Sequence, residues 1–445
     1  MEHLLDSLFL EIFSYFSICE KLRCSAVCRR WRRLVLDWKL WQEINVHKEP
    51  HLCSRLTDEK VKRWASAWGP RIRELYLGEC HWLTDQAVCY IGEQCPNLRV
   101  LHLAGCTQVS DVGISELSNS CFELRAVDLH RTRVSDLGFN FLVESNPGLE
   151  RMRLPSQGNC RRMIDAICRN CCKVTELTLQ NAIDEERFIL DDETFRRFAE
   201  RFPMLRKLDL TWCCRVTDRT LQWIARNCVS LRSLRIKECP MISDDGIRFI
   251  AERCRFLDDL HLERQSLVKN ACCYAIRDHL RHIRTLKLLD TCVTDKGIEA
   301  ITTNAGNLRK LCIGEYCFRP QNIKGLCLPA IARKCNKLEK LHVYSVKMDD
   351  AQLQRLCANL LQLRDLHLGT CRRVSRAGIR ELTEKCGKLT QLRLYGCPSF
   401  RDCHLQNMAL KMPRLRRLEI LGCNKVTEDG ANQFTEKRPD CLLKV

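Results

Sequence analysis

The chain has 445 residues, of which 45% are hydrophobic, and its formal net charge is +18. Glycine and proline are too scarce for a fibrous or disordered chain, and the basic excess favours acidic partners, nucleic acid or an anionic surface. No stretch reaches the roughly 20 uninterrupted apolar residues of a membrane-spanning helix, and acidic residues interrupt the N-terminal apolar positions where a secretory signal would stand. We therefore expect a cytoplasmic and/or nuclear chain with no membrane partner, whose 32 cysteines are thiols.

The first forty-five residues read as three short helices. Apolar residues at helical spacing form one face of the first, at Leu5, Leu8, Phe9, Ile12, Phe13 and Phe16. Ser17 and Glu20 have the spacing of a capping box that opens a second helix. A third apolar set runs from Leu22 to Leu34. So small an assembly buries little surface by itself, which predicts a partner.

Three of these stretches together resemble an F-box: residues 4–16 (LLDSLFLEIFSYF), residues 27–34 (VCRRWRRL) and residues 38–41 (WKLW). Leu5 departs from the family pattern, because it stands where proline is usual in the first turn. The resemblance implies docking of a Skp-family adaptor through Leu4, Leu5, Leu8, Ile12, Phe13, Val27, Cys28 and Trp31. The alternative is a helical cap that shields the first repeat of a solenoid.

Residues 46–70 are predicted to form a linker and one amphipathic capping helix. Thr57 and Asp58 mark its start, and Val61, Trp64 and Ala65 supply its apolar face. The predicted division is therefore 1–45 for the F-box, 46–70 for this linker and 71–445 for the repeats.

Residues 71–445 repeat the pattern L-x-x-L-x-L-x-x-C, as in Asn97 to Ile114. The first leucine-type position occurs fourteen times, at Ile72, Leu98, Leu124, Leu149, Val174, Leu205, Leu231, Leu257, Ile283, Leu308, Leu338, Leu363, Leu389 and Leu415. Most intervals are 25 or 26 residues, the period of a leucine-rich repeat with one strand and one helix per unit. The predicted fold is an α/β horseshoe solenoid of about fourteen repeats behind a small all-α segment.

Serine or threonine followed by aspartate, as in Ser110-Asp111, is predicted to start each convex helix with a side-chain cap. Many cysteines fall into two ladders that packing explains. One ends the strands, at Cys80, Cys106, Cys213, Cys239, Cys371, Cys397 and Cys423; the other ends the helices, at Cys95, Cys121, Cys171, Cys228, Cys254, Cys335 and Cys386. A further group, Cys160, Cys168, Cys171 and Cys172, lacks the paired spacing of a zinc site, so we predict no metal and no cofactor.

With the F-box in front, the chain is similar to F-box and leucine-rich-repeat proteins of the cysteine-containing subclass. The resemblance implies a non-catalytic substrate receptor of an SCF-type cullin ubiquitin ligase, with an adaptor, a cullin scaffold reached through it, and a protein substrate as partners. The alternatives are a repeat scaffold without a ligase role and a basic nucleic-acid-binding protein. The latter ranks lower, because the chain shows no recognised nucleic-acid fold. No phosphate loop or nucleophile motif indicates an enzyme.

Alternate strand residues should face the concave side of the sheet, where a substrate would bind. The candidate substrate residues are Arg151, Arg153, Lys207, Trp212, Arg235, Lys237, Lys287, Tyr344 and Tyr395. The basic members favour an acidic or phosphorylated segment, unless they merely cover a solvated surface. A weaker second patch comprises His342, Tyr344, His367, Arg393 and Tyr395. Two longer repeats, with insertions at Asp184–Glu186, Asp191–Glu193 and Phe318–Asn322, could supply contact loops.

Overall fold

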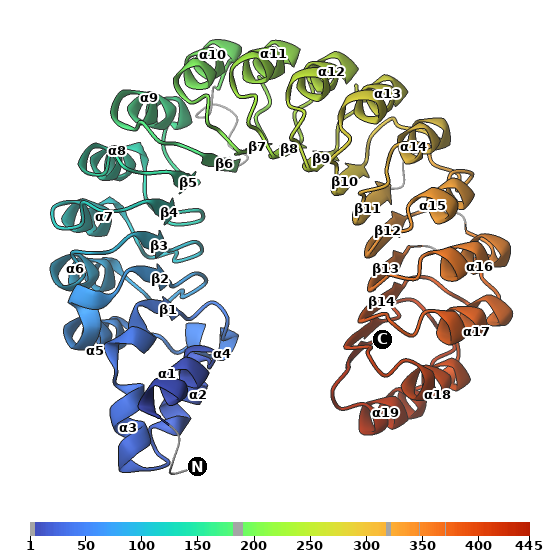
Figure 1. The fold of residues 1–445 in the computed structure, drawn as a ribbon, viewed down its shortest axis with the longest axis horizontal. Helices are drawn as coiled ribbons and strands as arrows, with labels where there is room; N and C mark the ends of the chain where they lie inside the picture. The colour runs from blue at the N-terminus through green and yellow to red at the C-terminus, as the bar shows by residue number, and fades with distance from the viewer. Residues whose placement is uncertain (1–4, 181–189, 317–321, 347, 370) are drawn as a thin grey trace. The chain divides into compact units, whose positions relative to one another are not determined.

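A computed structural model describes residues 5–180, 190–316, 322–346, 348–369 and 371–445 (Figure 1). Leu4, the loop at Asp184–Glu186 and most of the Phe318–Asn322 insertion lie outside the described residues. The chain forms two compact units, Met1–Cys213 and Cys214–Val445. None of the described helices is both long and apolar enough to cross a membrane.

The first unit begins with short helices and continues as a parallel sheet. The helical elements are α1 (Asp6–Ser14), α2 (Ile18–Cys24), α3 (Arg29–Val35), η1 (Trp38–Trp41), α4 (Pro50–Cys53), α5 (Asp58–Trp68), η2 (Gly69–Arg71), α6 (Asp85–Gln94), α7 (Asp111–Ser118), α8 (Asp136–Ser145), α9 (Cys160–Asn170) and α10 (Asp192–Arg201). The strands are β1 (Glu43–Asn45), β2 (Glu74–Tyr76), β3 (Val100–His102), β4 (Ala126–Asp128), β5 (Arg151–Arg153), β6 (Glu176–Gln180) and β7 (Lys207–Thr211), paired in chain order. Helices α5 to α10 line one side of these strands in Figure 1.

The second unit repeats the strand–helix alternation. Its helices are α11 (Asp218–Asn227), α12 (Asp244–Arg253), α13 (Asn270–His279), α14 (Asp295–Thr302), α15 (Leu328–Lys334), α16 (Asp350–Asn359), α17 (Arg376–Lys385), α18 (Asp402–Lys411) and α19 (Glu428–Lys437). Its strands are β8 (Ser233–Lys237), β9 (Asp259–Glu263), β10 (Thr285–Leu289), β11 (Lys310–Gly314), β12 (Lys340–Tyr344), β13 (Asp365–Leu368), β14 (Gln391–Leu394), β15 (Arg417–Glu419) and β16 (Leu442–Lys444).

Strand register in each unit follows the leucine pattern. Leu260, Leu286 and Leu311 lie opposite one another on β9, β10 and β11, and all three are buried. The prediction of a leucine-rich-repeat solenoid is confirmed, and the fourteen predicted repeats supply β2 to β15. Strands β1 and β16 were not predicted, because neither segment carries the leucine spacing.

The predicted side-chain caps are present at Ser110, Ser135, Thr217 and Ser243 but not at Thr294, and the capping residue often also contacts the preceding repeat. Ser110 accepts a hydrogen bond from the backbone amide of Val112 (3.3 Å) and so caps α7. Asp85, at the start of the preceding helix, accepts hydrogen bonds from both the backbone amide (2.7 Å) and the hydroxyl (2.6 Å) of Ser110. The same pair of bonds joins Asp58 to Thr84, Asp111 to Ser135, Asp218 to Ser243, Asp350 to Ser375 and Asp402 to Thr427. We call this series the aspartate ladder.

The two cysteine ladders are buried, as the packing interpretation required. All fourteen of their side chains are buried. Burial raises the pKa of Cys95 to about 12 and that of Cys121 to about 11, which keeps both as thiols at neutral pH. Some thiols donate to a carbonyl of the preceding repeat, as Cys106 does to Leu77 (3.2 Å). These cysteines therefore serve packing.

Candidate functional site

The first three helices enclose a small aromatic core. The ring of Trp31 on α3 lies 5.5 Å from Phe9 and 5.2 Å from Phe13, both on α1. Phe13 is only 1% exposed, so it stabilises this core and presents no surface to a partner. Trp31 also packs here, although it is partly accessible. For Phe13 this is a correction: the side chain expected to touch an adaptor lies inside the segment.

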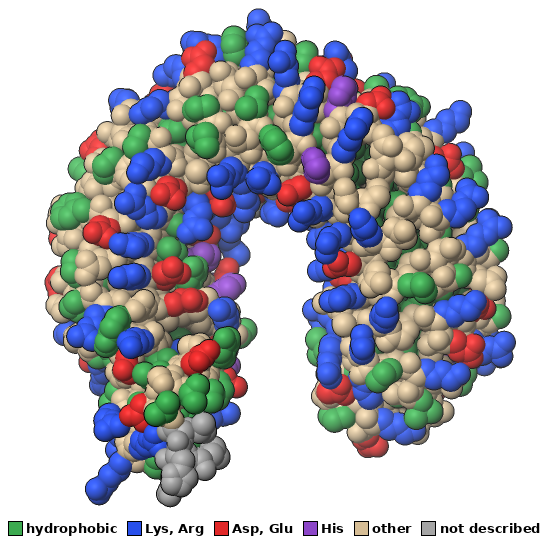
Figure 2. All heavy atoms as spheres, viewed as in Figure 1, with side chains coloured by type: hydrophobic (Ala, Val, Ile, Leu, Met, Phe, Trp, Pro, Cys, Tyr) green, Lys and Arg blue, Asp and Glu red, His purple; other side chains and the backbone are tan. Residues whose placement is uncertain are grey.

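Several aliphatic side chains of the same segment face outward. Leu5 is 69% exposed, Ile12 44% and Val27 63%, and Leu8 is also exposed. Leu5, Leu8 and Ile12 share one side of α1, while Val27 lies in the turn before α3. We call these four side chains the aliphatic set. In Figure 2 hydrophobic side chains gather over these first helices. Exposed apolar side chains that gather in a patch are typical of an interaction surface.

Polar contacts fix the helices that carry the aliphatic set. Asp6 on α1 accepts hydrogen bonds from Arg30 (2.7 Å) and Arg33 (2.8 Å) on α3. The hydrogen bond from Arg30 is the main cause that lowers the pKa of the Asp6 carboxyl. The predicted capping box is confirmed, since Ser17 accepts from the Glu20 amide while Glu20 accepts from the Ser17 amide. The exposed thiol Cys28 caps α3 by accepting from the Trp31 amide (3.3 Å).

In the first unit, the predicted basic residues of the strand face stand beside acidic neighbours. Arg151 is exposed, whereas Arg153 lies 3.5 Å from Asp128 on β4. Lys207 lies 3.7 Å from Glu176 on β6. Trp212, just after β7, adopts a left-handed backbone conformation with φ of 63°. Sequence reasoning selected the cations and missed the carboxylates that accompany them.

In the second unit, Arg235 and Lys237 lie on β8 and Lys287 on β10. Lys287 pairs with Glu263 of β9 at 3.4 Å. His261 lies between Arg235 and Lys287 in the register and contacts Asp259 at 2.8 Å. The predicted basic residues of this unit are therefore mixed with acidic and imidazole groups.

A concave pocket of about 620 Å³ opens on the strand face of the second unit. We call it the strand pocket. It is lined by Lys287, Leu289, Lys310, Cys312, Glu315, Tyr316, His342, Tyr344, Ser345, His367, Gly369, Arg393 and Tyr395. It brings together all five members of the patch that the sequence ranked second, together with Lys287.

Aromatic rings form a continuous row across the strand pocket. The ring of Tyr344 lies 4.4 Å from Tyr316 and 4.4 Å from His367, and His367 lies 4.7 Å from Tyr395. Beside this row, Gly314 allows a close approach to the Tyr344 backbone, since its φ is 105° and a Cβ there would meet the Tyr344 carbonyl oxygen at 2.0 Å. Tyr316 was not predicted, because it follows its strand by two residues.

Buried carboxylates hold the polar groups of the strand pocket in place. Asp365 contacts His342 (3.1 Å) and Arg393 (3.2 Å), and Glu419 accepts from the Tyr395 hydroxyl (2.7 Å). Burial acts to raise the pKa of Asp365, but the adjacent His342 and Arg393 outweigh it and the pKa is lowered. Burial and the nearby Glu419 raise the pKa of Tyr395 to about 12. The tyrosine therefore stays a neutral donor.

The strand pocket also contains groups whose hydrogen-bonding capacity is not used. Burial, with the charges of His342 and Arg393, lowers the pKa of His367 to about 4. Among the described residues, the Nε2 atom of His367 has no hydrogen-bond partner, and Lys310 has no ion-pair partner. Flat rings beside fixed polar groups are the usual composition of a recognition pocket.

The four candidate metal cysteines do not assemble. Within the described part of the chain, Cys160, Cys168, Cys171 and Cys172 are not among the groups whose ligand atoms converge. Cys160 and Cys171 are buried, and burial raises the pKa of each to about 12. They pack in the repeats as thiols.

Comparisons with known proteins agree with this architecture. A family model described as F-box-like matches residues 4–47, and one described as Leucine Rich repeat matches residues 94–118, 203–222 and 279–301. The human F-box/LRR-repeat protein 12 is 30% identical over 102 residues, which cover 21% of this chain and 29% of the human protein. Its mouse counterpart is 46% identical over 41 residues, or 9% of this chain and 13% of the mouse protein. The matches thus span less than a third of these relatives.

Among solved structures, the yeast Rad7 and Elc1 complex contains a chain that aligns with a TM-score of 0.50 and 15% identity, over 90% of this chain and 88% of that one. This likeness concerns the fold alone. The resemblance inferred from the sequence is confirmed: the chain carries an F-box-like segment followed by leucine-rich repeats.

Proposed function

We propose that this protein is the substrate-recognition subunit of an SCF-type cullin ubiquitin ligase and has no active site of its own. The F-box-like segment docks a Skp-family adaptor, which connects it to the cullin scaffold. The observation that carries the proposal is the aliphatic set, exposed on a segment that matches the F-box-like model. Burial of such side chains gives each roughly 1.5 to 3 kcal/mol of favourable transfer free energy.

The repeats supply the substrate site in this proposal, and the strand pocket is its best candidate. Its row of rings can accept an anchoring side chain, and aromatic residues and arginine dominate the energetics of protein interfaces. Lys310 lines the pocket without a carboxylate partner among the described residues, so it favours an acidic or phosphorylated substrate segment. The basic residues of the first unit carry less of this preference, because Arg153 and Lys207 already face carboxylates.

The proposal is tested by separating adaptor binding from substrate binding. We compare the wild-type chain with a Leu8→Glu/Ile12→Glu variant after expression in cells. Leu361→Glu is the matched control, since Leu361 is 63% exposed in the second unit. Both the wild type and the control should co-purify a Skp-family adaptor, a cullin and ubiquitinated client proteins. The double variant should retain the clients, unmodified, and lose the adaptor.

Two outcomes would contradict the proposal. If the double variant recovered as much adaptor as the wild type, the F-box-like segment would not dock the adaptor through these side chains. Recovery of clients whose ubiquitination is the same in all three samples would instead support the scaffold alternative.

A further inference from the structure

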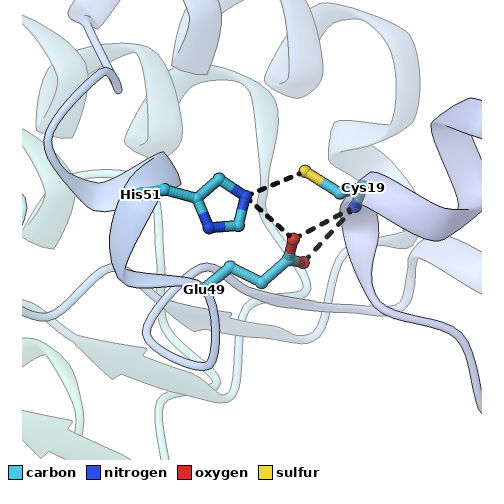
Figure 3. A group of neighbouring side chains, drawn as sticks. All are labelled: Cys19, Glu49 and His51. Atoms are coloured by element: carbon cyan, nitrogen blue, oxygen red, sulfur yellow. Dashed lines mark hydrogen bonds and ion pairs between the residues drawn. The ribbon is translucent and has the colours of Figure 1, made fainter. Parts of the chain in front are cut away.

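Three metal-ligating side chains converge where the F-box-like segment meets the start of the sheet. Cys19 lies on α2, and Glu49 and His51 lie at and just after the N-terminal boundary of α4, about thirty residues along the chain (Figure 3). The Cys19 Sγ atom is 3.3 Å from His51 Nε2, which is 3.7 Å from Glu49 Oε2. One ligand atom from each residue lies within 4.8 Å of the others.

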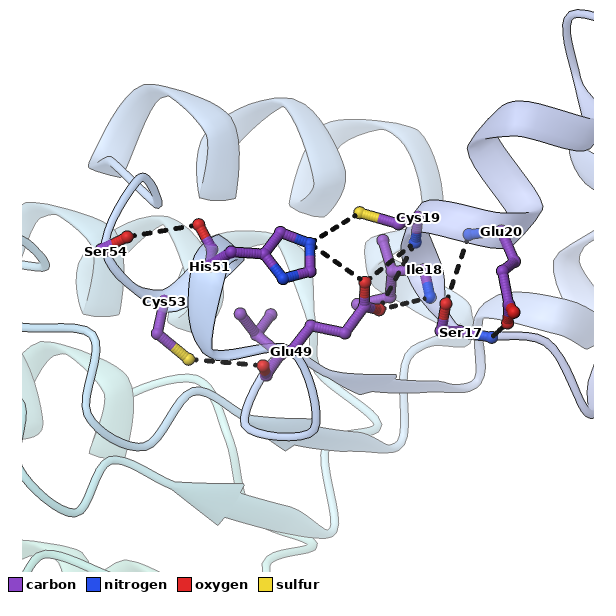
Figure 4. A network of polar contacts seen from close by, with 9 residues as sticks. Ser17, Ile18, Cys19, Glu20, Glu49, His51, Cys53 and Ser54 are labelled. Carbon is purple, nitrogen blue, oxygen red and sulfur yellow. Dashed lines mark hydrogen bonds and ion pairs between the residues drawn. The ribbon is translucent and has the colours of Figure 1, made fainter. Parts of the chain in front are cut away.

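Glu49 already has one structural role. Its carboxylate accepts hydrogen bonds from the backbone amides of Ile18 (2.7 Å) and Cys19 (3.3 Å), beside the capping box of Ser17 and Glu20 (Figure 4). The residue is 7% exposed, so these amides hold its carboxylate in a fixed position. A carboxylate offers about four lone-pair sites, and the amides leave room for a further ligand.

Two of the three separations between the ligand atoms are close to those around a tetrahedral zinc ion, and the third is within 4.8 Å. Bonds of about 2.3 Å to sulfur and about 2.0 to 2.1 Å to nitrogen and oxygen place neighbouring ligand atoms about 3.4 to 3.6 Å apart. The two measured separations, 3.3 Å and 3.7 Å, bracket that range. Thiolate, imidazole and carboxylate are also the ligand types that zinc accepts.

We propose that Cys19, Glu49 and His51 form a Zn²⁺ site with a solvent-filled fourth position. The His51 side chain is 63% exposed, which leaves an open approach on one side of the cluster. Glu49 supplies the rigid anchor, and the ion then needs only small movements of Cys19 and His51.

Binding changes the proton balance of the cluster. Without the ion, the hydrogen bond with Glu49 is the largest cause that raises the pKa of the Cys19 thiol. Zinc binds the thiolate, so the thiol proton is released to solvent as the Zn–S bond forms. No electron is transferred.

The site would tie together two segments that are far apart in sequence. Cys19 belongs to α2 of the F-box-like segment, whereas Glu49 and His51 follow β1, which pairs with β2 of the repeats. A metal bond between them closes a loop of about thirty residues, which stabilises the junction in the manner of a cross-link. Sequence reasoning looked for closely spaced cysteines and could not find a ligand set divided in this way.

The test uses the full-length chain, reduced and stripped of metal, with zinc titrated against a chromophoric chelator. Cys19→Ser and His51→Ala should each bind one fewer tight zinc ion, or bind that ion at least about tenfold more weakly. Cys24→Ser is the matched control, because Cys24 ends the same helix and belongs to no converging ligand group among the residues that the structure describes. It should behave as the wild type.

Cobalt provides a second readout, because loss of a thiolate-to-cobalt band in Cys19→Ser and not in Cys24→Ser assigns that band to Cys19. The wild type and Cys24→Ser should show a thiolate-to-cobalt charge-transfer band, together with visible bands of tetrahedral intensity. Cys19→Ser should lose the charge-transfer band, and zinc should raise the thermal midpoint of the wild type and not of Cys19→Ser. His51 is exposed, so its alanine variant should remain folded.

Identical zinc stoichiometry, affinity and cobalt spectra in all four proteins would overturn the proposal. Zinc would then bind only adventitiously at other thiols, and the cluster would be a hydrogen-bonded tie between α4 and α2. These readouts do not involve the adaptor, so the result is independent of the proposed ligase function.

Discussion

The F-box-like segment and the strand pocket expose opposite kinds of chemistry. Leu5, Ile12 and Val27 present bare aliphatic surface around a buried aromatic core. The strand pocket presents aromatic rings, and carboxylates such as Asp365 and Glu419 hold its polar groups in place. Aliphatic surface binds through area and discriminates little, whereas fixed polar groups reject partners that leave them unpaired. The molecule therefore shows one surface suited to a constant partner and another suited to selection.

The largest expected effect tests the core beneath the aliphatic surface. Phe13→Ala removes a buried ring and should destabilise α1 to α3 by about 3 to 5 kcal/mol. Hydrogen exchange of the amides in these helices measures this loss. Leu8→Ala, at an exposed position, should change the stability of α1 to α3 by less than about 0.5 kcal/mol. Equal effects of the two substitutions would mean that core and surface are not separate in this segment.

The second prediction isolates the surface. Val27→Glu should leave exchange protection unchanged, because Val27 is 63% exposed, yet it should weaken the affinity for a Skp-family adaptor by about a hundredfold. Titration calorimetry with the purified adaptor measures the affinity. Leu137→Glu on α8, at a similarly exposed position, is the control. Unchanged affinity for the Val27 variant would exclude this turn from the interface.

The third prediction concerns the charge state of the strand pocket. The folded-state pKa of His367 is about 4, below the usual 6.5, because the side chain is buried and lies near His342 and Arg393. The unfolded chain therefore takes up the proton first. Stability contributed by this site should fall by roughly 3 kcal/mol as pH drops from about 6.5 to about 4. The pH dependence of the His367 imidazole Cε1–H signal in NMR spectra measures the titration, and the signal is identified by its absence in His367→Asn. A midpoint near 6.5 would contradict the burial argument.

The smallest predicted effect concerns the anchor in the strand pocket. Tyr344→Ala should reduce capture of client proteins about tenfold, because it interrupts the row of rings, and should leave adaptor binding unchanged. Quantitative mass spectrometry of co-purified proteins measures this. Tyr274→Ala on helix α13 is the control, since that tyrosine is exposed outside the pocket. A similar loss of captured client proteins with both variants would show that the strand pocket is not the substrate-binding site.

The repeats were predictable because their leucine-type residues recur at a regular spacing along the chain. Every strand from β2 to β15 follows a leucine position that can be read from the sequence, and the two-residue alternation placed Tyr344 and Arg393 on the strand face. Strand β1 was not predicted, because Glu43–Asn45 has no repeat pattern and forms a strand only by pairing with β2.

The candidate sites depended on contacts between distant residues, and these were less predictable. Arg153 pairs with Asp128 and Arg393 pairs with Asp365, and the partners in each pair are about 25 residues apart in the sequence. The number of basic residues in the sequence cannot show that these two arginines have acidic partners. Phe13 had the residue type of a surface anchor, but only packing against Trp31 shows that it faces inward. The cluster of Cys19, Glu49 and His51 depends in the same way on tertiary proximity.

The aspartate ladder has a consequence for how such a chain can change length. In a repeat such as that of α7, Ser110 makes the bond to the repeat before, and Asp111 makes the bond to the repeat after. Where consecutive repeats both carry this Ser/Thr-Asp pair, one whole repeat can therefore be duplicated or deleted and the aspartate before it still meets a hydroxyl, whereas a gain or loss of part of a repeat leaves it unmatched. The same bonds that join neighbouring repeats thus favour growth of the chain in complete units.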